Sequence, residues 1–224
     1  MLGNRKQEFN FYKFNLKRQY MSNYFSAADL VKKSATQIKY LRDKMISIHT
    51  WKMEHGVQFQ KQIAEQKEES AEEFRTSFED HCKENDIVIF ATHDIVCPNK
   101  VIEVKTTEFG AEQWYLESSL LQTAFYKCLI MASNGDMFTP KFRVKKGYKK
   151  EYKKVDTNIE YHLQFGDEEY NVLIDNPQEI INYFLEKAKI TLGTYDECRN
   201  YDALHKFKHF EQLKHCFKYE KLNY

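Results

Sequence analysis

Glu103 and Lys105 are the first residues that suggest chemistry, because a carboxylate and an ammonium two positions apart share one face of a β-strand. Residues 86–97 and 100–107 form runs rich in Val and Ile, and the Pro-Asn pair between them predicts a turn. The pattern therefore predicts a β-hairpin that presents an acid and a base side by side. The alternative is an amphipathic hairpin whose Glu–Lys pair faces solvent.

The register of this hairpin decides whether Asp94 joins the pair. A four-residue turn at residues 97–100, with Pro98 at its second position, places Asp94 opposite Glu103. A three-residue loop would send Asp94 to the other face unless a bulge restored it. Neighbouring buried carboxylates need a cation, and Mg²⁺ or Mn²⁺ prefers their oxygens. Lys105 would then orient the attacking water or stabilise charge on a phosphate.

The segment after the hairpin predicts a helix over residues 111–131. Its expected buried stripe is Trp114, Leu121, Phe125 and Cys128. Gln122 and Tyr126 are four residues apart and therefore lie on one side of such a helix. On this pattern alone an ordinary polar face is the favoured interpretation, and a functional pair is the alternative.

A strongly basic segment follows, and its lysines alternate with aromatic residues. Lysines neutralise phosphates and aromatic rings stack on bases, so the segment suits a nucleic-acid groove as well as a solvated β-ribbon. The candidate contacts are Lys145, Lys146, Lys149, Lys150, Tyr152, Lys153 and Lys154.

The remaining pattern predicts short helices before residue 50, a long helix over residues 57–83, and a hairpin over residues 159–174. A helix is expected from Pro177 to Leu192, followed by further helix from residue 196. His205 and His209 have a metal-ligand spacing, but a solvated helix face is the favoured interpretation because no glutamate follows the first histidine.

Composition limits the class of protein. The chain has 224 residues, of which 42% are hydrophobic and 15% aromatic, which favours one folded domain. No apolar run approaches the roughly 18 residues of a membrane span. A net charge of +1 means that any nucleic-acid surface must come from segregated charges. The 5 cysteines lack the spacing of a disulfide framework, zinc site or iron–sulfur site, which favours a reducing intracellular compartment, with the cytoplasm preferred over mitochondrion or nucleus.

In order, Asp94, Glu103-Val104-Lys105 and Gln122-xxx-Tyr126 resemble the motifs of the PD-(D/E)xK nuclease superfamily, in its RecB-like and phage-type exonuclease branch. The resemblance covers roughly residues 56–126. In this branch a preceding helix usually supplies a GxxxE or GxxxH residue, and here Gln60 stands in that place. The chain resembles the members of the branch that lack an iron–sulfur cluster.

The resemblance implies an α/β fold, with a mixed β-sheet flanked by helices in a restriction-endonuclease-like core and helical additions at both ends. One nuclease domain would span residues 1–224, with an N-terminal arm and helices (1–50), a catalytic core (54–146), and a β-hairpin with C-terminal helices (147–224).

The resemblance also assigns roles to residues. Asp94, Glu103, the Val104 carbonyl and Gln60 would bind Mg²⁺ or Mn²⁺. Lys105 would orient the water, and Gln122 and Tyr126 would position the nucleic acid strand. The implied activity is that of a metal-dependent DNA exonuclease acting on DNA ends or single strands.

Two alternatives remain open. An RNA endonuclease of the cap-snatching kind would share the metal-binding fold and would cut RNA without needing a DNA end. A catalytically silent nucleic-acid-binding subunit is the second, because the amide of Gln60 is a poorer metal ligand than a carboxylate.

Overall fold

The computed structural model of the chain describes residues 23–44, 74–82, 85–107, 112–138, 152–205 and 208–223. These residues form an α/β structure with two mixed sheets. The first sheet has the order β1 (Tyr24–Ser26), β3 (Asn85–His93), β2 (Phe74–Cys82), β6 (Asp136–Phe138) and β7 (Tyr152–Lys154). The second has the order β10 (Phe217–Leu222), β9 (Glu168–Ile174), β8 (Glu160–Phe165), β5 (Lys100–Lys105) and β4 (Ile95–Val96).

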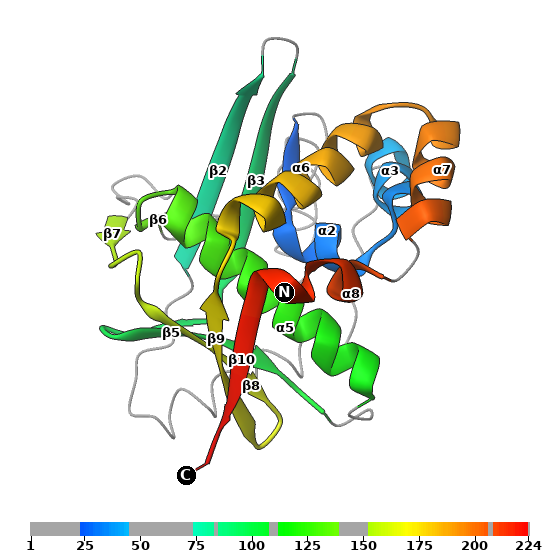
Figure 1. Cartoon of the computed structure of the whole chain (residues 1–224). Coiled ribbons are helices and arrows are strands. Elements are labelled where there is room, and N and C mark those ends of the chain that lie inside the picture. Colours follow the sequence, from blue (N-terminus) through cyan, green and yellow to red (C-terminus); the bar gives the residue numbers. More distant parts are fainter. Residues whose placement is uncertain are drawn as a thin grey trace, which may run out of the picture.

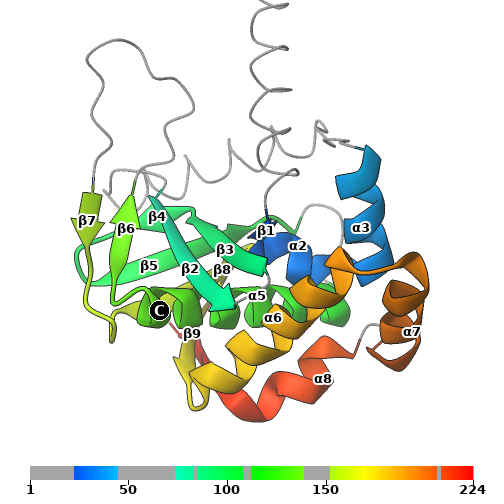
Figure 2. The ribbon, with the colours of Figure 1, turned by 90° about the horizontal axis from the view of Figure 1, so that it is seen from above.

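Each sheet contains one parallel pair, β1 with β3 and β5 with β8, and its other pairs are antiparallel. The helices are α2 (Ala27–Lys32), α3 (Ala35–Lys44), α5 (Gln113–Ala132), α6 (Pro177–Leu192), α7 (Tyr195–His205), α8 (His209–Leu213) and the 3-10 helix η1 (Lys214–Cys216). Figure 2 shows β7 at one side of the molecule and α3 with α7 at the other. Within these described helices, none has the length and apolar character that crossing a membrane requires.

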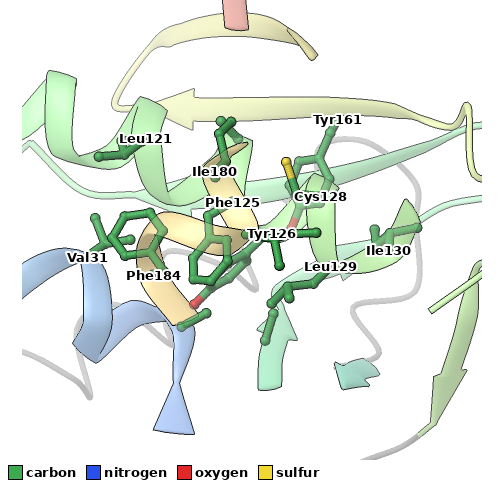
Figure 3. Close-up of a cluster of buried hydrophobic side chains, with 14 of the residues drawn as sticks. Val31, Leu121, Phe125, Tyr126, Cys128, Leu129, Ile130, Tyr161, Ile180 and Phe184 are labelled. Atoms are coloured by element: carbon green, nitrogen blue, oxygen red, sulfur yellow. The ribbon is translucent and has the colours of Figure 1, made fainter. Parts of the chain in front are cut away.

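Helix α5 is the centre of the core. It crosses the middle of the molecule and contacts strands of both sheets as well as α2 and α6 (Figure 1). Every residue from Ser119 to Ile130 is buried, so even its polar side chains lie inside the protein. Phe125 stacks on Phe184 of α6 with ring centroids 4.4 Å apart (Figure 3). Polar residues on this helix therefore need partners within the fold.

Several expected elements are confirmed. Helix α6 has the predicted bounds, and Oδ1 of Asn176 accepts a hydrogen bond from the backbone N–H of Glu179, 3.3 Å away, as an N-cap does. Strands β8 and β9 form the predicted hairpin. Its turn requires Gly166, whose φ is +58° and whose added Cβ would lie 2.5 Å from Oγ1 of Thr107.

Several expectations are wrong. Residues 86–97, predicted as one arm of a hairpin with residues 100–107, divide between β3, which pairs with β2 in the first sheet, and the short β4, which pairs with β5. Residues 74–82, predicted to end a long helix, instead form β2, which pairs with β3 along its whole length. The buried backbone N–H and C=O groups of the apolar strand β3 need hydrogen-bond partners, and β2 provides them. The chain after η1 is not helical, since β10 covers the edge of β9. Trp114 is 63% exposed, whereas the rest of its expected stripe is buried. The remainder of the predicted 57–83 helix lies outside the described residues.

A buried lysine ties α2 to the C-terminal helices. The ammonium of Lys187 on α6 donates to the carbonyl oxygens of Leu30 (2.7 Å) and Lys33 (2.6 Å) at the end of α2. It also contacts Nε2 of His209 at 3.1 Å. The last carbonyls of a helix have no hydrogen-bond donor within the helix, so the ammonium of Lys187 supplies donors to the end of α2. This contact fixes the position of α2.

We expect the contact between Lys187 and His209 to make the folded chain less stable in acid. Burial, followed by the charge of Lys187, lowers the pKa of His209 from 6.5 to about 3. Between these values the unfolded chain binds a proton that the native imidazole does not, so stability falls as the pH decreases from about 6.5. The melting temperature of the wild type should therefore fall more steeply between about pH 6.5 and about pH 4 than that of His209→Gln, which does not titrate. Equal slopes in calorimetric scans would contradict this.

Candidate active site

The turn of the central hairpin has the predicted register. The backbone N–H of Cys97 donates to the carbonyl of Lys100 at 2.9 Å, so residues 97–100 form a four-residue turn. Ile95 then pairs with Ile102, and Val96 pairs with Val101. Continuing the antiparallel register by one residue places Asp94 opposite Glu103.

Asp94 is the residue at which the chain passes from one sheet to the other. Strand β3 of the first sheet ends at His93, and β4 of the second begins at Ile95. Because β4 stops here, the N–H of Val104 on β5 has no strand acceptor on that side, and Oδ2 of Asp94 accepts it at 2.9 Å. This hydrogen bond fixes the Asp94 carboxylate against β5.

Glu103 lies at the centre of the site and is only 2% exposed. Its Oε1 accepts hydrogen bonds from Nε2 of Gln122 at 2.7 Å and from the ammonium of Lys105. Among the residues that the structure describes, no hydrogen-bond partner reaches its buried Oε2 or the buried Oε1 of Gln122. Two buried oxygen atoms in one cluster therefore lack the partners that such groups normally have.

The charges of the cluster act on one another. Burial, followed by the Asp94 carboxylate, raises the pKa of Glu103 to about 7, while Lys105 opposes the rise. Burial alone would lower the pKa of Lys105, but the Glu103 and Asp94 carboxylates outweigh burial and raise it. The lysine therefore remains an ammonium and favours the ionised form of Glu103.

Lys32 is a fourth charged group that sequence reasoning missed. It is the last residue of α2, and its side chain is exposed to solvent at the edge of the site. Burial of part of this side chain, followed by the charge of Lys105, lowers the pKa of Lys32 to about 7, while Glu103 and Asp94 oppose the fall. Since α2 reaches the hairpin only through the tertiary fold, no local sequence signal links these residues. We call Lys32, Asp94, Glu103, Lys105 and Gln122 the Glu103 cluster.

Tyr126 forms an inner wall of the site. It is buried one turn after Gln122, and its ring meets that of His93 edge to face, with centroids 5.6 Å apart. The His93 Nδ1 atom lies 2.6 Å from the hydroxyl of Tyr161 on β8 (Tyr126 and Tyr161 are labelled in Figure 3). Burial, followed by the Glu103 and Asp94 charges, raises the pKa of Tyr126. Tyr126 is therefore a neutral phenol, enclosed rather than open to a substrate.

The other predicted residues lie elsewhere. Tyr152 and its two following lysines lie on β7, the outer strand of the first sheet, where Tyr152 is 74% exposed. Lys154 pairs with Asp136 at 3.6 Å. Gln60 and the lysines at positions 145, 146, 149 and 150 lie outside the described residues.

The donor set fits a hard divalent cation. Asp94 and Glu103 offer carboxylates, Gln122 offers its buried amide oxygen, and Val104 offers its carbonyl, which accepts from Nζ of Lys105 at 3.3 Å. Oxygen ligands alone suit Mg²⁺ or Mn²⁺, and the buried Oε2 of Glu103 is an acceptor that such an ion would satisfy.

Comparisons of the chain with protein-family models, with curated proteins and with solved structures found no match.

The contacts within the Glu103 cluster make opposite predictions for two variants. Asp94→Asn removes the neighbouring negative charge and should lower the pKa of Glu103, whereas Lys105→Met removes the neighbouring positive charge and should raise it. NMR titration of the Glu103 side-chain carboxyl carbon measures both shifts. Shifts of the same sign would mean that the two carboxylates do not lie side by side.

Proposed function

We propose that the chain is a metal-dependent nuclease that hydrolyses phosphodiester bonds in DNA, at ends or in single strands, with a restriction-endonuclease-like core around β4, β5 and α5. The observation that carries this proposal is the buried carboxylate of Glu103, whose Oε2 has no hydrogen-bond partner in the described part of the chain although Asp94 and two lysines lie close by. A buried carboxylate that could hold a cation, next to lysine ammonium groups, suits a phosphate substrate.

Mg²⁺ or Mn²⁺ would be held by Asp94 and Glu103, together with the Val104 carbonyl and the Gln122 amide oxygen. When bound, this ion would polarise the phosphate and stabilise the charge that develops on it. Gln60 remains a predicted further ligand.

The side chains of the chain itself have separate tasks. The Gln122 amide and the Lys105 ammonium both hold Oε1 of Glu103, which keeps its carboxylate in one orientation. The third N–H group of Lys105 can orient a water for attack on phosphorus. Lys32 is accessible to solvent, so its ammonium can contact a phosphate oxygen that enters the site.

The proposed route of the DNA includes the outer strand of the first sheet. The exposed ring of Tyr152 can stack on a base, and Lys153 on the same strand can contact the backbone. The predicted lysines before this strand would extend the path. Because the net charge of the chain is only +1, this local concentration of lysines matters more than the overall charge.

A cleavage assay tests the proposal. The purified chain is incubated with end-labelled single- and double-stranded DNA and RNA in Mg²⁺, Mn²⁺ or EDTA. We expect DNA cleavage that requires the ion, and a loss of at least about 100-fold in Glu103→Gln, as is typical when charge stabilisation is removed.

Glu169→Gln is the matched control for this assay. Glu169 is 4% exposed and pairs with Nδ1 of His162 at 2.6 Å, so it is a buried carboxylate outside the Glu103 cluster. Cleavage should survive in this variant if folding does. Cleavage of RNA alone would instead support the cap-snatching type of endonuclease, and DNA binding without cleavage in Mn²⁺ would support the silent subunit; either outcome contradicts the proposal.

Lys32 makes a further prediction about substrate binding. If its ammonium contacts the phosphate, Lys32→Ala should weaken DNA binding and reduce its dependence on salt, because one fewer counterion is released. Lys39→Ala is the control, since Lys39 lies on α3 and pairs with Asp43 at 3.7 Å. Filter-binding titrations at several salt concentrations measure the effect, and an unchanged salt slope in Lys32→Ala would remove this residue from the substrate path.

A further inference from the structure

We propose that Glu179, His215 and Cys216 bind a borderline transition-metal ion, of which Zn²⁺ is the natural candidate, at a site separate from the Glu103 cluster. The Oε1 of Glu179 lies 2.9 Å from Nε2 of His215, which lies 3.4 Å from Sγ of Cys216. All three ligand atoms fall within 4.8 Å of one another. No local spacing in the sequence predicts this site, because Glu179 and His215 are 36 residues apart.

The three ligand types select the metal. A carboxylate oxygen, an imidazole nitrogen and a thiolate sulfur are common zinc ligands, with bonds of about 2.0–2.3 Å. Tetrahedral ligands at those distances lie roughly 3.3–3.8 Å apart. The present separations of 2.9 Å, 3.4 Å and, for the third pair, at most 4.8 Å reach these values through small side-chain movements. Mg²⁺ and Ca²⁺ disfavour sulfur, which distinguishes this site from the oxygen-only set at Glu103.

The backbone that carries the ligands is already fixed. The N–H groups of Asp175 and Asn176 both donate to the carbonyl of Cys216, at 2.9 and 3.0 Å. They hold η1 against the first turn of α6, where Glu179 lies. The side-chain amide of Asn176 donates to Oε2 of Glu179 at 2.8 Å, which leaves Oε1 directed at His215. The ligands therefore need little ordering before they bind an ion.

The fourth position of the metal would face solvent. The side chains of Glu179 and His215 are 45% and 60% exposed, whereas Cys216 is buried. A water can therefore complete the tetrahedron. Burial, followed by the charge of Glu179, raises the pKa of Cys216 to about 11. On binding, the S–H bond breaks, the proton leaves to solvent and the sulfur bonds to the metal, with no change in oxidation state.

Such a site would join two distant parts of the chain. Residues 214–216 lead directly into β10, the edge strand of the second sheet, and Glu179 lies in the helix that contacts α5. A metal that binds only the folded chain stabilises it in proportion to the logarithm of its concentration. The expected role of the metal ion is therefore to stabilise the packing of η1 and the start of β10 against α6.

The test uses the full chain and Co²⁺, which reports thiolate coordination through a sulfur-to-cobalt charge-transfer band. We expect one equivalent of Co²⁺ to produce this band and Zn²⁺ to abolish it by displacement. Cys216→Ser should lose the band, whereas Cys198→Ser, at a buried cysteine on α7, should keep it. Absence of the band in the wild type, or its survival in Cys216→Ser, would overturn the proposal.

A second variant covers the case in which Cys216→Ser does not fold. His215→Ala changes an exposed side chain and should fold, yet it should raise the Co²⁺ dissociation constant by at least about 10-fold, a loss typical of damage to a metal's ligand environment. Glu103→Gln should bind Co²⁺ at the thiolate site as tightly as the wild type does, which separates this site from the proposed nuclease centre. An unchanged affinity in His215→Ala would show that Co²⁺ does not occupy this site.

Discussion

Burial of the Glu103 carboxylate is the interaction on which the rest of the candidate site depends. An ionised carboxylate with almost no access to water is strongly disfavoured unless it is paired and hydrogen-bonded. Lys105 supplies the opposite charge and Gln122 a hydrogen bond, but both reach the same oxygen atom. The other oxygen is left without a partner in the part of the chain that the structure describes, and a divalent cation would provide one.

The fold creates this arrangement by changing sheets at a single residue. Since β3 and β4 belong to different sheets, the backbone bends at Asp94, and its side chain takes over a hydrogen bond that a longer strand would have made. Gln122 contacts Glu103 from helix α5, and Lys32 lies near the site at the end of α2. Lys187 helps to hold α2 through two hydrogen bonds, so a buried amine outside the site contributes to the position of Lys32.

The parts of the site that depend on local chemistry could be predicted from the sequence. Pro98 fixes a turn, and the turn fixes the register that brings Asp94 to Glu103, so a short stretch contains the necessary information. Lys32 and the trio of Glu179, His215 and Cys216 could not be found in this way, because their neighbours come from distant elements. Residues 74–82 were predicted incorrectly for the same reason, since their conformation is decided by pairing with β3.

The proposed nuclease function depends on a divalent cation held jointly by Asp94 and Glu103. Anomalous diffraction from crystals of the chain soaked in Mn²⁺ tests it most directly, because manganese is located without reference to activity. We expect an anomalous peak within bonding distance of both carboxylates, about 2.0–2.6 Å from the nearest oxygen atoms. We also expect the loss of that peak in Glu103→Gln crystals. Manganese that bound only elsewhere in the wild type, with none between these two side chains, would contradict the proposal.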